Sequence, residues 1–194
     1  MKTYEIVVTR MFENEGVTYS KSLPITLPCA DLPEKLSKLG INIDNFKSEE
    51  LDVNLITKLY IDHPLRIYIE NSISCRELNF RMLNQIIQEL SQLNDDELEQ
   101  LMLFMGFNEI SYKDTLSAIH SFRNADYYDG DGYVSLTEGL LWDGYFDKFF
   151  GFPVSELSPA IMRYIDIEML SDEIVRVNFV ASPDERWFLK VRDL

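Results

Sequence analysis

Lysine and arginine are scarce in this chain of 194 residues, which has 18 of them against 33 aspartates and glutamates and a net charge of −15. A surface with so few cations repels nucleic acid and anionic membranes, and it attracts basic proteins. The lack of a basic patch therefore argues against a protein that binds nucleic acid.

Cysteine and histidine are rare as well, with two of each. Cys29 and Cys75 have no C-x-x-C spacing, and His63 and His120 stand far apart, so no zinc site or disulfide framework is indicated. The chain also lacks the motifs G-x-S-x-G, G-x-G-x-x-G and H-E-x-x-H and a P-loop. These absences leave an enzymatic activity and a cofactor without support in the residues, and we expect neither.

Long apolar runs are missing too. No stretch of about 18 apolar residues is available to span a bilayer. The first ten residues carry charges at Lys2, Glu5 and Arg10 and do not resemble a signal peptide. We expect a cytoplasmic protein without a membrane partner, and its 46% hydrophobic residues are enough to form real cores.

The first 71 residues predict a small antiparallel sheet that carries one helix. Residues 4–9 and 17–27 have strand composition and flank the turn signal Glu13-Asn14-Glu15-Gly16, which indicates a hairpin. Asp31 as an N-cap, Pro33 in the first turn and Gly40 as a stop indicate a helix between them.

The next part of this segment predicts a loop and two further strands. Residues 42–52 are polar and indicate the loop. Residues 55–62 and 65–70 have strand composition on either side of His63-Pro64.

The pattern changes at residue 72, where helices are predicted. Apolar residues recur every three or four positions over residues 76–93, which indicates a helix with one buried face. Asn94 followed three residues later by Glu97 resembles a capping box that starts a second helix. Residues 111–122 indicate a third.

The last third mixes helices and strands. A loop over residues 124–133 leads into a helix over residues 136–150, a short helix starts at Ser158-Pro159, and residues 174–181 and 186–191 form a closing hairpin. The whole chain therefore predicts an α+β fold with three domains: residues 1–71 (α+β), 72–123 (helical) and 124–194 (α+β).

Acidic residues concentrate between Met82 and Asp147, where thirteen of them accompany only Lys113 and Arg123, a local net charge of −11. They are Glu89, Asp95, Asp96, Glu97, Glu99, Glu109, Asp114, Asp126, Asp129, Asp131, Glu138, Asp143 and Asp147. Such a field either imitates the charge of DNA or simply keeps the protein soluble.

One local motif suggests a metal site. Residues 127–138 fit the twelve-residue calcium loop of EF-hands, with Asp129, Asp131, the carbonyl of Tyr133 and Glu138 as ligands. Position 1 is defective, because Tyr127 stands where a carboxylate is needed. The alternatives are a calcium-binding or small-ligand module and a Gly-Asp loop that merely turns the chain.

Several short stretches, in this order along the chain, resemble the ArdA-type antirestriction proteins of mobile genetic elements. The N-terminal hairpin is followed by Asp31-Leu32-Pro33-Glu34-Lys35-Leu36, and Glu77-Leu78-Asn79 leads to Leu93-Asn94-Asp95-Asp96-Glu97-Leu98. Gly151-Phe152-Pro153-Val154 and Tyr164-Ile165-Asp166-Ile167-Glu168 follow near the end. The chain departs from the family at Leu170-Ser171-Asp172-Glu173-Ile174, where a Gly-Arg-Asp-Leu run is usual, and in two longer segments, residues 42–54 and 124–133.

The resemblance implies an elongated three-domain protein whose carboxylates replace DNA phosphates in the basic groove of a type I restriction-modification enzyme. The predicted mimic surface consists of the thirteen acids above together with Glu156, Asp166, Glu168, Asp172 and Glu173. Family members pair through their C-terminal domain, so we expect a homodimer. Its predicted interface residues are Phe149, Phe150, Phe152 and Val154; the alternative is that these side chains are buried inside the domain.

Overall fold

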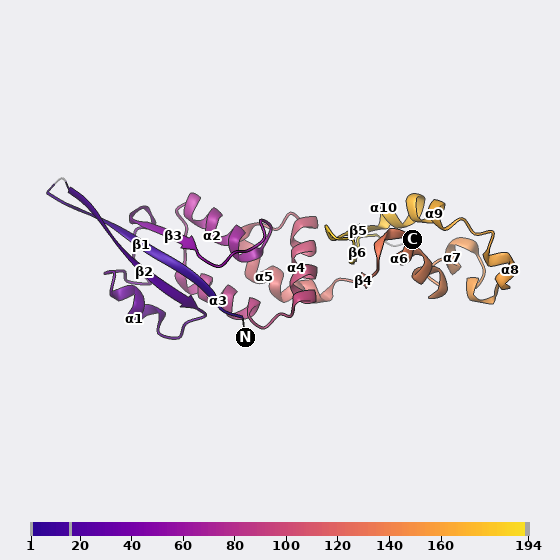
Figure 1. The fold of residues 1–194 in the computed structure, drawn as a ribbon, viewed down its shortest axis with the longest axis horizontal. Coiled ribbons are helices and arrows are strands. Elements are labelled where there is room, and N and C mark those ends of the chain that lie inside the picture. The colour runs from indigo at the N-terminus through magenta and orange to yellow at the C-terminus, as the bar shows by residue number, and fades with distance from the viewer. Residues whose placement is uncertain (1, 16, 193–194) are drawn as a thin grey trace. The chain divides into compact units, whose positions relative to one another are not determined.

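The computed structural model describes residues 2–15 and 17–192 (Figure 1). Within them the fold is α+β, as predicted, with two small antiparallel sheets and many short helices. The chain forms two compact units: unit 1 is Met1–Leu98 with Asn108–His120, and unit 2 is Glu99–Phe107 with Ser121–Leu194. The division into three domains at residues 71 and 123 stays a prediction.

The sheet of unit 1 has the strand order β2-β1-β3, with β1 (Tyr4–Asn14), β2 (Val17–Leu27) and β3 (Leu51–Leu55). The predicted hairpin is confirmed, since β1 and β2 pair antiparallel from Tyr4↔Leu27 to Asn14↔Val17. Gly16, in the predicted turn, lies outside the described residues.

Helix α1 (Leu32–Ser37) follows the hairpin, with Pro33 in its first turn and Leu32 and Leu36 buried. The chain then turns at Gly40, whose φ of 69° is the left-handed conformation that ends helices. The predicted helix and its stop are therefore both found in the structure.

The strands predicted over residues 55–62 and 65–70 are largely wrong. Only Leu55 belongs to β3, which begins at Leu51 inside the predicted loop, after the 3-10 turn η1 (Ser48–Glu50). Residues 65–70 belong to helix α2 (Pro64–Ser74), because His63 caps its N-terminus and Pro64 starts it. The buried side chains of α2 include Leu65, Tyr68, Ile69 and Ser72, a helical spacing that outweighs the β-branched composition.

The remaining helices of this region are α3 (Phe80–Leu90), α4 (Asp95–Phe107) and α5 (Thr115–Ser121), with the 3-10 turns η2 (Tyr112–Asp114) and η3 (Phe122–Asn124) on either side of α5. Helix α3 is shorter than the predicted span of residues 76–93, since Asn79 caps it through a hydrogen bond from Met82 N–H. Its buried face is Phe80, Leu83, Ile86, Ile87 and Leu90.

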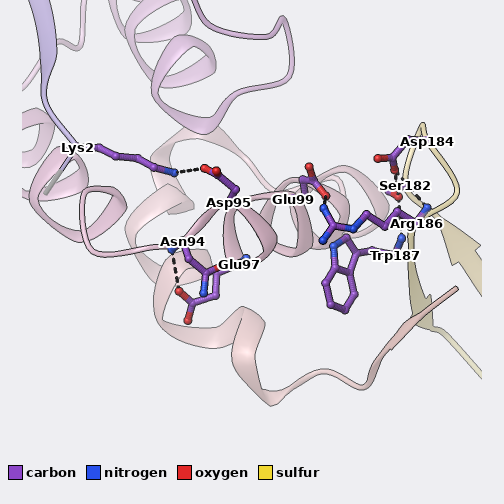
Figure 2. Close-up of polar contacts among 9 residues, drawn as sticks. All are labelled: Lys2, Asn94, Asp95, Glu97, Glu99, Ser182, Asp184, Arg186 and Trp187. Atoms are coloured by element: carbon purple, nitrogen blue, oxygen red, sulfur yellow. Dashed lines mark hydrogen bonds and ion pairs between the residues drawn. The ribbon is translucent and has the colours of Figure 1, made fainter.

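The predicted capping box at the start of α4 is confirmed (Figure 2). Glu97 N–H donates to Asn94 Oδ1 at 2.8 Å, and Asn94 N–H donates to Glu97 Oε2 at 3.0 Å. Both backbone donors would otherwise lack a partner within the helix.

We expect Asn94→Ala to lower the free energy of unfolding by about 1 kcal/mol, because it removes one half of this box. Urea unfolding followed by far-UV circular dichroism measures the change. Asn94→Ser is the matched control, since serine also caps helices and should restore most of the loss. Equal destabilisation by alanine and serine would contradict the capping role.

In unit 2 the sheet has the order β4-β6-β5, with β4 (Tyr127–Asp129), β5 (Phe179–Ala181) and β6 (Trp187–Lys190). The closing hairpin is confirmed as the antiparallel pair β5 and β6. Strand β4 was not predicted, because its Asp- and Gly-rich surroundings indicated a loop; it forms by pairing with β6. Phe179 and Phe188 lie in the core of unit 2 with Leu140, Phe146 and Val154.

The helix predicted over residues 136–150 is two helices, α6 (Gly132–Trp142) and α7 (Asp147–Phe150). The break falls at Gly144, whose φ of 76° is strained for residues with a Cβ. The chain continues through η4 (Val154–Glu156), α8 (Pro159–Met162), α9 (Ile167–Leu170), the π-helical turn η5 (Ser171–Val175) and α10 (Arg176–Asn178). The first half of the predicted strand 174–181 is thus helical.

None of the helices in the described residues is both long and apolar enough to span a membrane.

Candidate functional site

All eighteen carboxylates of the predicted mimic surface are exposed or half-buried, and none is buried. Six belong to unit 1: Glu89, Asp95, Asp96, Glu97, Glu109 and Asp114. Twelve belong to unit 2: Glu99, Asp126, Asp129, Asp131, Glu138, Asp143, Asp147, Glu156, Asp166, Glu168, Asp172 and Glu173. Each unit therefore presents its own part of the acidic surface.

In the described parts of the chain, Asp95, Glu99 and Asp172 each pair with a cation. Asp95 Oδ1 accepts from Lys2 Nζ at 2.6 Å in unit 1, and this hydrogen bond lowers the pKa of Asp95 (Figure 2). In unit 2, Glu99 Oε2 lies 3.8 Å from Arg186 Nη1. Asp172 accepts from Arg176 Nε at 2.9 Å, one turn along the chain. Such exposed pairs contribute little to stability, but they reduce the charge offered to a partner.

Thirteen other carboxylates of the surface have no ammonium or guanidinium group within 4 Å in the described parts of the chain. They are Glu89, Glu109, Asp114, Asp126, Asp129, Asp131, Glu138, Asp143, Asp147, Glu156, Asp166, Glu168 and Glu173. The cations of unit 1 mostly pair with acids outside the predicted surface. These acids are Asp31, Asp44, Glu49, Glu50, Glu70 and Glu77.

A few members of the predicted surface also hold the backbone in place. Glu97 completes the capping box of α4. Asp147 Oδ1 accepts from Val154 N–H at 2.8 Å, and Asp166 Oδ1 caps α9 by accepting from Met169 N–H at 2.9 Å. Substitutions at these three positions would therefore mix changes of charge with changes of fold.

Asp184, which was not predicted as a site residue, shapes the turn between β5 and β6 (Figure 2). It accepts from Ser182 Oγ at 2.6 Å and from Arg186 N–H at 3.3 Å, and Ser182 Oγ accepts from Trp187 N–H at 3.0 Å. The hydroxyl of Ser182 lowers the pKa of Asp184. The sequence Ser-Pro-Asp-Glu signalled this turn but not its hydrogen bonds.

The segment predicted as a calcium loop has a different conformation. Asp129 ends strand β4, and Tyr133 and Glu138 lie on α6, which begins at Gly132. Asp131 is the exposed N-cap residue of that helix. Among the residues that the structure describes, no three His, Cys, Asp or Glu side chains are grouped so that they could hold a metal ion. Calcium binding stays a prediction, without support from this geometry.

The predicted dimer interface is only partly on the surface. Val154 is fully buried in the core of unit 2, so its place in an interface is wrong. Phe150 is half-buried and packs against that core. Phe149 and Phe152 are exposed, and their rings lie 5.3 Å and 5.8 Å from the ring of Phe150. Val154 N–H donates to Asp147 Oδ1 at the start of η4, and its side chain packs in the core with Phe146 and Phe188.

Sequence reasoning overlooked Trp142. It ends α6 with 59% of its surface exposed, one turn after the exposed Glu138 and next to the exposed Asp143. The turn signal Asp143-Gly144 was available in the sequence, and it would have placed Trp142 at a helix end.

Comparison with known proteins gives no family for this chain. No protein-family model matches the sequence, and no curated protein matches it either.

Proposed function

We propose that this protein is a DNA mimic of the antirestriction type, which occupies the basic DNA-binding groove of an enzyme with its surface carboxylates. The target class implied by the resemblance is the type I restriction-modification enzymes. The protein acts by competition with DNA, so no residue is assigned a catalytic role and no cofactor is needed.

The observation that carries this proposal is the set of thirteen exposed or half-buried carboxylates without a cation within 4 Å in the described parts of the chain. An acidic protein selected only for solubility would gain from interspersed charges of both signs. Here the cations of unit 1 pair with other acids, which leaves this set available to the lysines and arginines of a partner.

The physical basis is competition between two polyanions. DNA carries one charge per about 1.7 Å of helix axis, and carboxylates one helical turn apart are separated by about 5–6 Å, so the protein matches that density only in part. Carboxylates fixed on a folded surface lose little freedom on binding, which offsets the lower density. Because the attraction is electrostatic, binding should weaken with added salt.

The test is a competition assay against labelled DNA with a type I restriction-modification enzyme. We expect neutralisation of four unpaired acids to weaken inhibition about tenfold and to flatten its salt dependence, since each exposed charge pair contributes about 0.2–1 kcal/mol. The variant combines Asp126→Asn, Asp129→Asn, Asp131→Asn and Glu138→Gln.

The matched control removes four exposed acids outside the predicted surface and has the same net charge of −11. It combines Glu5→Gln, Glu13→Gln, Glu34→Gln and Asp62→Asn. We expect the control to inhibit nearly as well as the unchanged protein. Equal losses in both variants would mean that only the net charge matters. Complete loss with Asp131→Asn alone would indicate a discrete active site instead of a distributed surface.

A further inference from the structure

The outer face of α6 carries an exposed apolar row that includes one carboxylate. Val134, Glu138 and Trp142 are spaced four residues apart, so their side chains are neighbours along the helix. Val134 is 44% exposed and Trp142 is 59% exposed, whereas Leu136, Leu140 and Leu141 on the other side of α6 are buried. The helix thus has a packed inner face and an outer face that the described residues of unit 2 leave largely exposed.

Trp142 lies beside two acids that have no cation. Glu138 precedes it by one turn and Asp143 follows it directly; both are exposed. Among the described residues, no lysine or arginine lies within 4 Å of either carboxylate or over the indole ring. Solvent-exposed tryptophan is uncommon on a free surface and is enriched at the energetic centres of protein interfaces.

The surroundings of Trp187 show which cation packs beside both an indole and a carboxylate in this protein. Arg186 lies 5.8 Å from the ring centre of Trp187, and its guanidinium is also 3.8 Å from the carboxylate of Glu99 (Figure 2). Within unit 2, the guanidinium of Arg186 therefore lies close to an indole and a carboxylate at the same time. Trp142 with Glu138 and Asp143 has the same two components and lacks the guanidinium.

We propose that the outer face of α6, made of Val134, Glu138 and Trp142, binds an arginine side chain of a basic partner protein. A guanidinium stacks on the indole by a cation–π contact while its edge N–H groups donate to the carboxylate of Glu138, one turn away on the same face. Lysine fits less well, because its ammonium is a compact charge without a flat face. This inference rests on the proposed function and names the chemistry by which unit 2 holds its target.

Charge complementarity favours this partner. Unit 2 contains fifteen aspartates and glutamates and seven lysines and arginines, a net charge of −8. A second copy of the same face would bring Glu138 and Asp143 against like charges, which is unfavourable at close range. A basic surface removes that repulsion and covers the indole.

The experiment uses the full chain with Trp187→Phe, which leaves Trp142 as the only tryptophan. Trp187 Nε1 is buried and has no acceptor among the described residues, so phenylalanine removes no observed hydrogen bond there. The probes are octa-arginine and octa-lysine at the same salt concentration. We expect octa-arginine to change the Trp142 emission saturably and to bind about two- to fivefold more tightly than octa-lysine.

Calorimetric titrations of further variants test the residues. Trp142→Ala should remove the preference for arginine, and Glu138→Gln with Asp143→Asn should weaken both peptides severalfold. The matched control, Glu168→Gln with Glu173→Gln, removes two exposed acids elsewhere in unit 2 and should keep the preference. Binding of octa-arginine without a change in Trp142 emission, or an unchanged preference in Trp142→Ala, would overturn the proposal.

Three further outcomes separate this proposal from its alternatives. A dimer seen by ultracentrifugation without peptide, and abolished by Trp142→Ala, would overturn it in favour of a second copy. In the DNA competition assay, full inhibition by Trp142→Ala would overturn the partner contact while the proposed function stands. A clear arginine preference in a protein that does not inhibit the enzyme would support the arginine site and reject the proposed function.

Discussion

Replacing Phe146 by alanine is expected to destabilise unit 2 by about 3–5 kcal/mol, the usual cost of removing a large aromatic side chain from a core. Phe146 is fully buried among the residues that hold α6, α7 and the second sheet together. Its ring lies 5.7 Å from that of Tyr145 and 6.4 Å from that of Phe150. Urea unfolding followed by tryptophan fluorescence reports on this unit, since Trp142 and Trp187 both belong to it.

This substitution also separates shape from charge, because the net charge of −15 is unchanged. If carboxylates must be held in place to imitate DNA, inhibition should fall steeply under conditions in which unit 2 is unfolded. Phe149→Ala is the matched control: Phe149 lies in α7, which Phe146 precedes as the N-cap residue, but it is 57% exposed, so we expect a loss of stability below about 1 kcal/mol and normal inhibition. Full inhibition by unfolded Phe146→Ala would mean that a flexible polyanion suffices and that mimicry is the wrong description.

Unit 1 is expected to lose stability as the pH falls from 6.5 towards 4, because His63 is held neutral in the fold. Burial, and to a lesser extent the charge of Lys2, lower the pKa of His63 to about 4. Its Nδ1 accepts the hydrogen bond from Leu65 N–H at 3.2 Å that caps α2, so protonation there would also break the cap. His63 is only 2% exposed and packs edge-on against the ring of Tyr4.

The sign follows from linkage. The unfolded chain takes up a proton near pH 6.5 and the folded chain only near pH 4, so the contribution is complete above pH 6.5 and is lost between these values. The full loss is on the order of 3 kcal/mol, of which about 2 kcal/mol appears by pH 5. Carboxylates with lowered pKa values, such as Asp44 and Glu77, also stabilise the fold, but their contribution is lost only as the pH falls further.

Urea unfolding followed by circular dichroism between pH 7 and pH 5 measures this dependence. The matched variant is His63→Asn, because asparagine caps helices and does not titrate in this range. We expect its stability to be lower than that of the unchanged protein at pH 7 and much less dependent on pH. An equal slope in both proteins would show that His63 does not cause the effect.

Local signals in the sequence predicted the elements that depend on neighbours along the chain. The hairpin of β1 and β2 is signalled by the short sequence that joins its strands, and the capping box of Asn94 and Glu97 and the stop at Gly40 depend on residues a few positions apart. The prediction of a strand over residues 65–70 was wrong, because the helical spacing of Leu65, Tyr68, Ile69 and Ser72 outweighs the strand-like composition of this segment. The sequence did not predict strand β4, because this strand forms through pairing with β6, about sixty residues later in the chain.

For the candidate site, the sequence determined that acidic residues are abundant and that most lie outside the apolar faces of helices, which is why all eighteen predicted ones reach the surface. It did not determine which of them meet a cation. Lys2 and Asp95 are far apart in sequence, as are Glu99 and Arg186, and only folding brings each pair together.

By itself, then, the sequence determined the class of fold, the charge and the local caps, because these depend on composition and on residues close in the chain. Tertiary structure alone decided that Val154 is buried while Phe149 and Trp142 are exposed, although all three lie in the same aromatic region. The physical reason is that the chain changes direction at Gly144 and again at Gly151, so Trp142, Phe149 and Val154 belong to three separate short elements. Burial depends on that direction and on the side chains that pack there, and no local pattern specifies both.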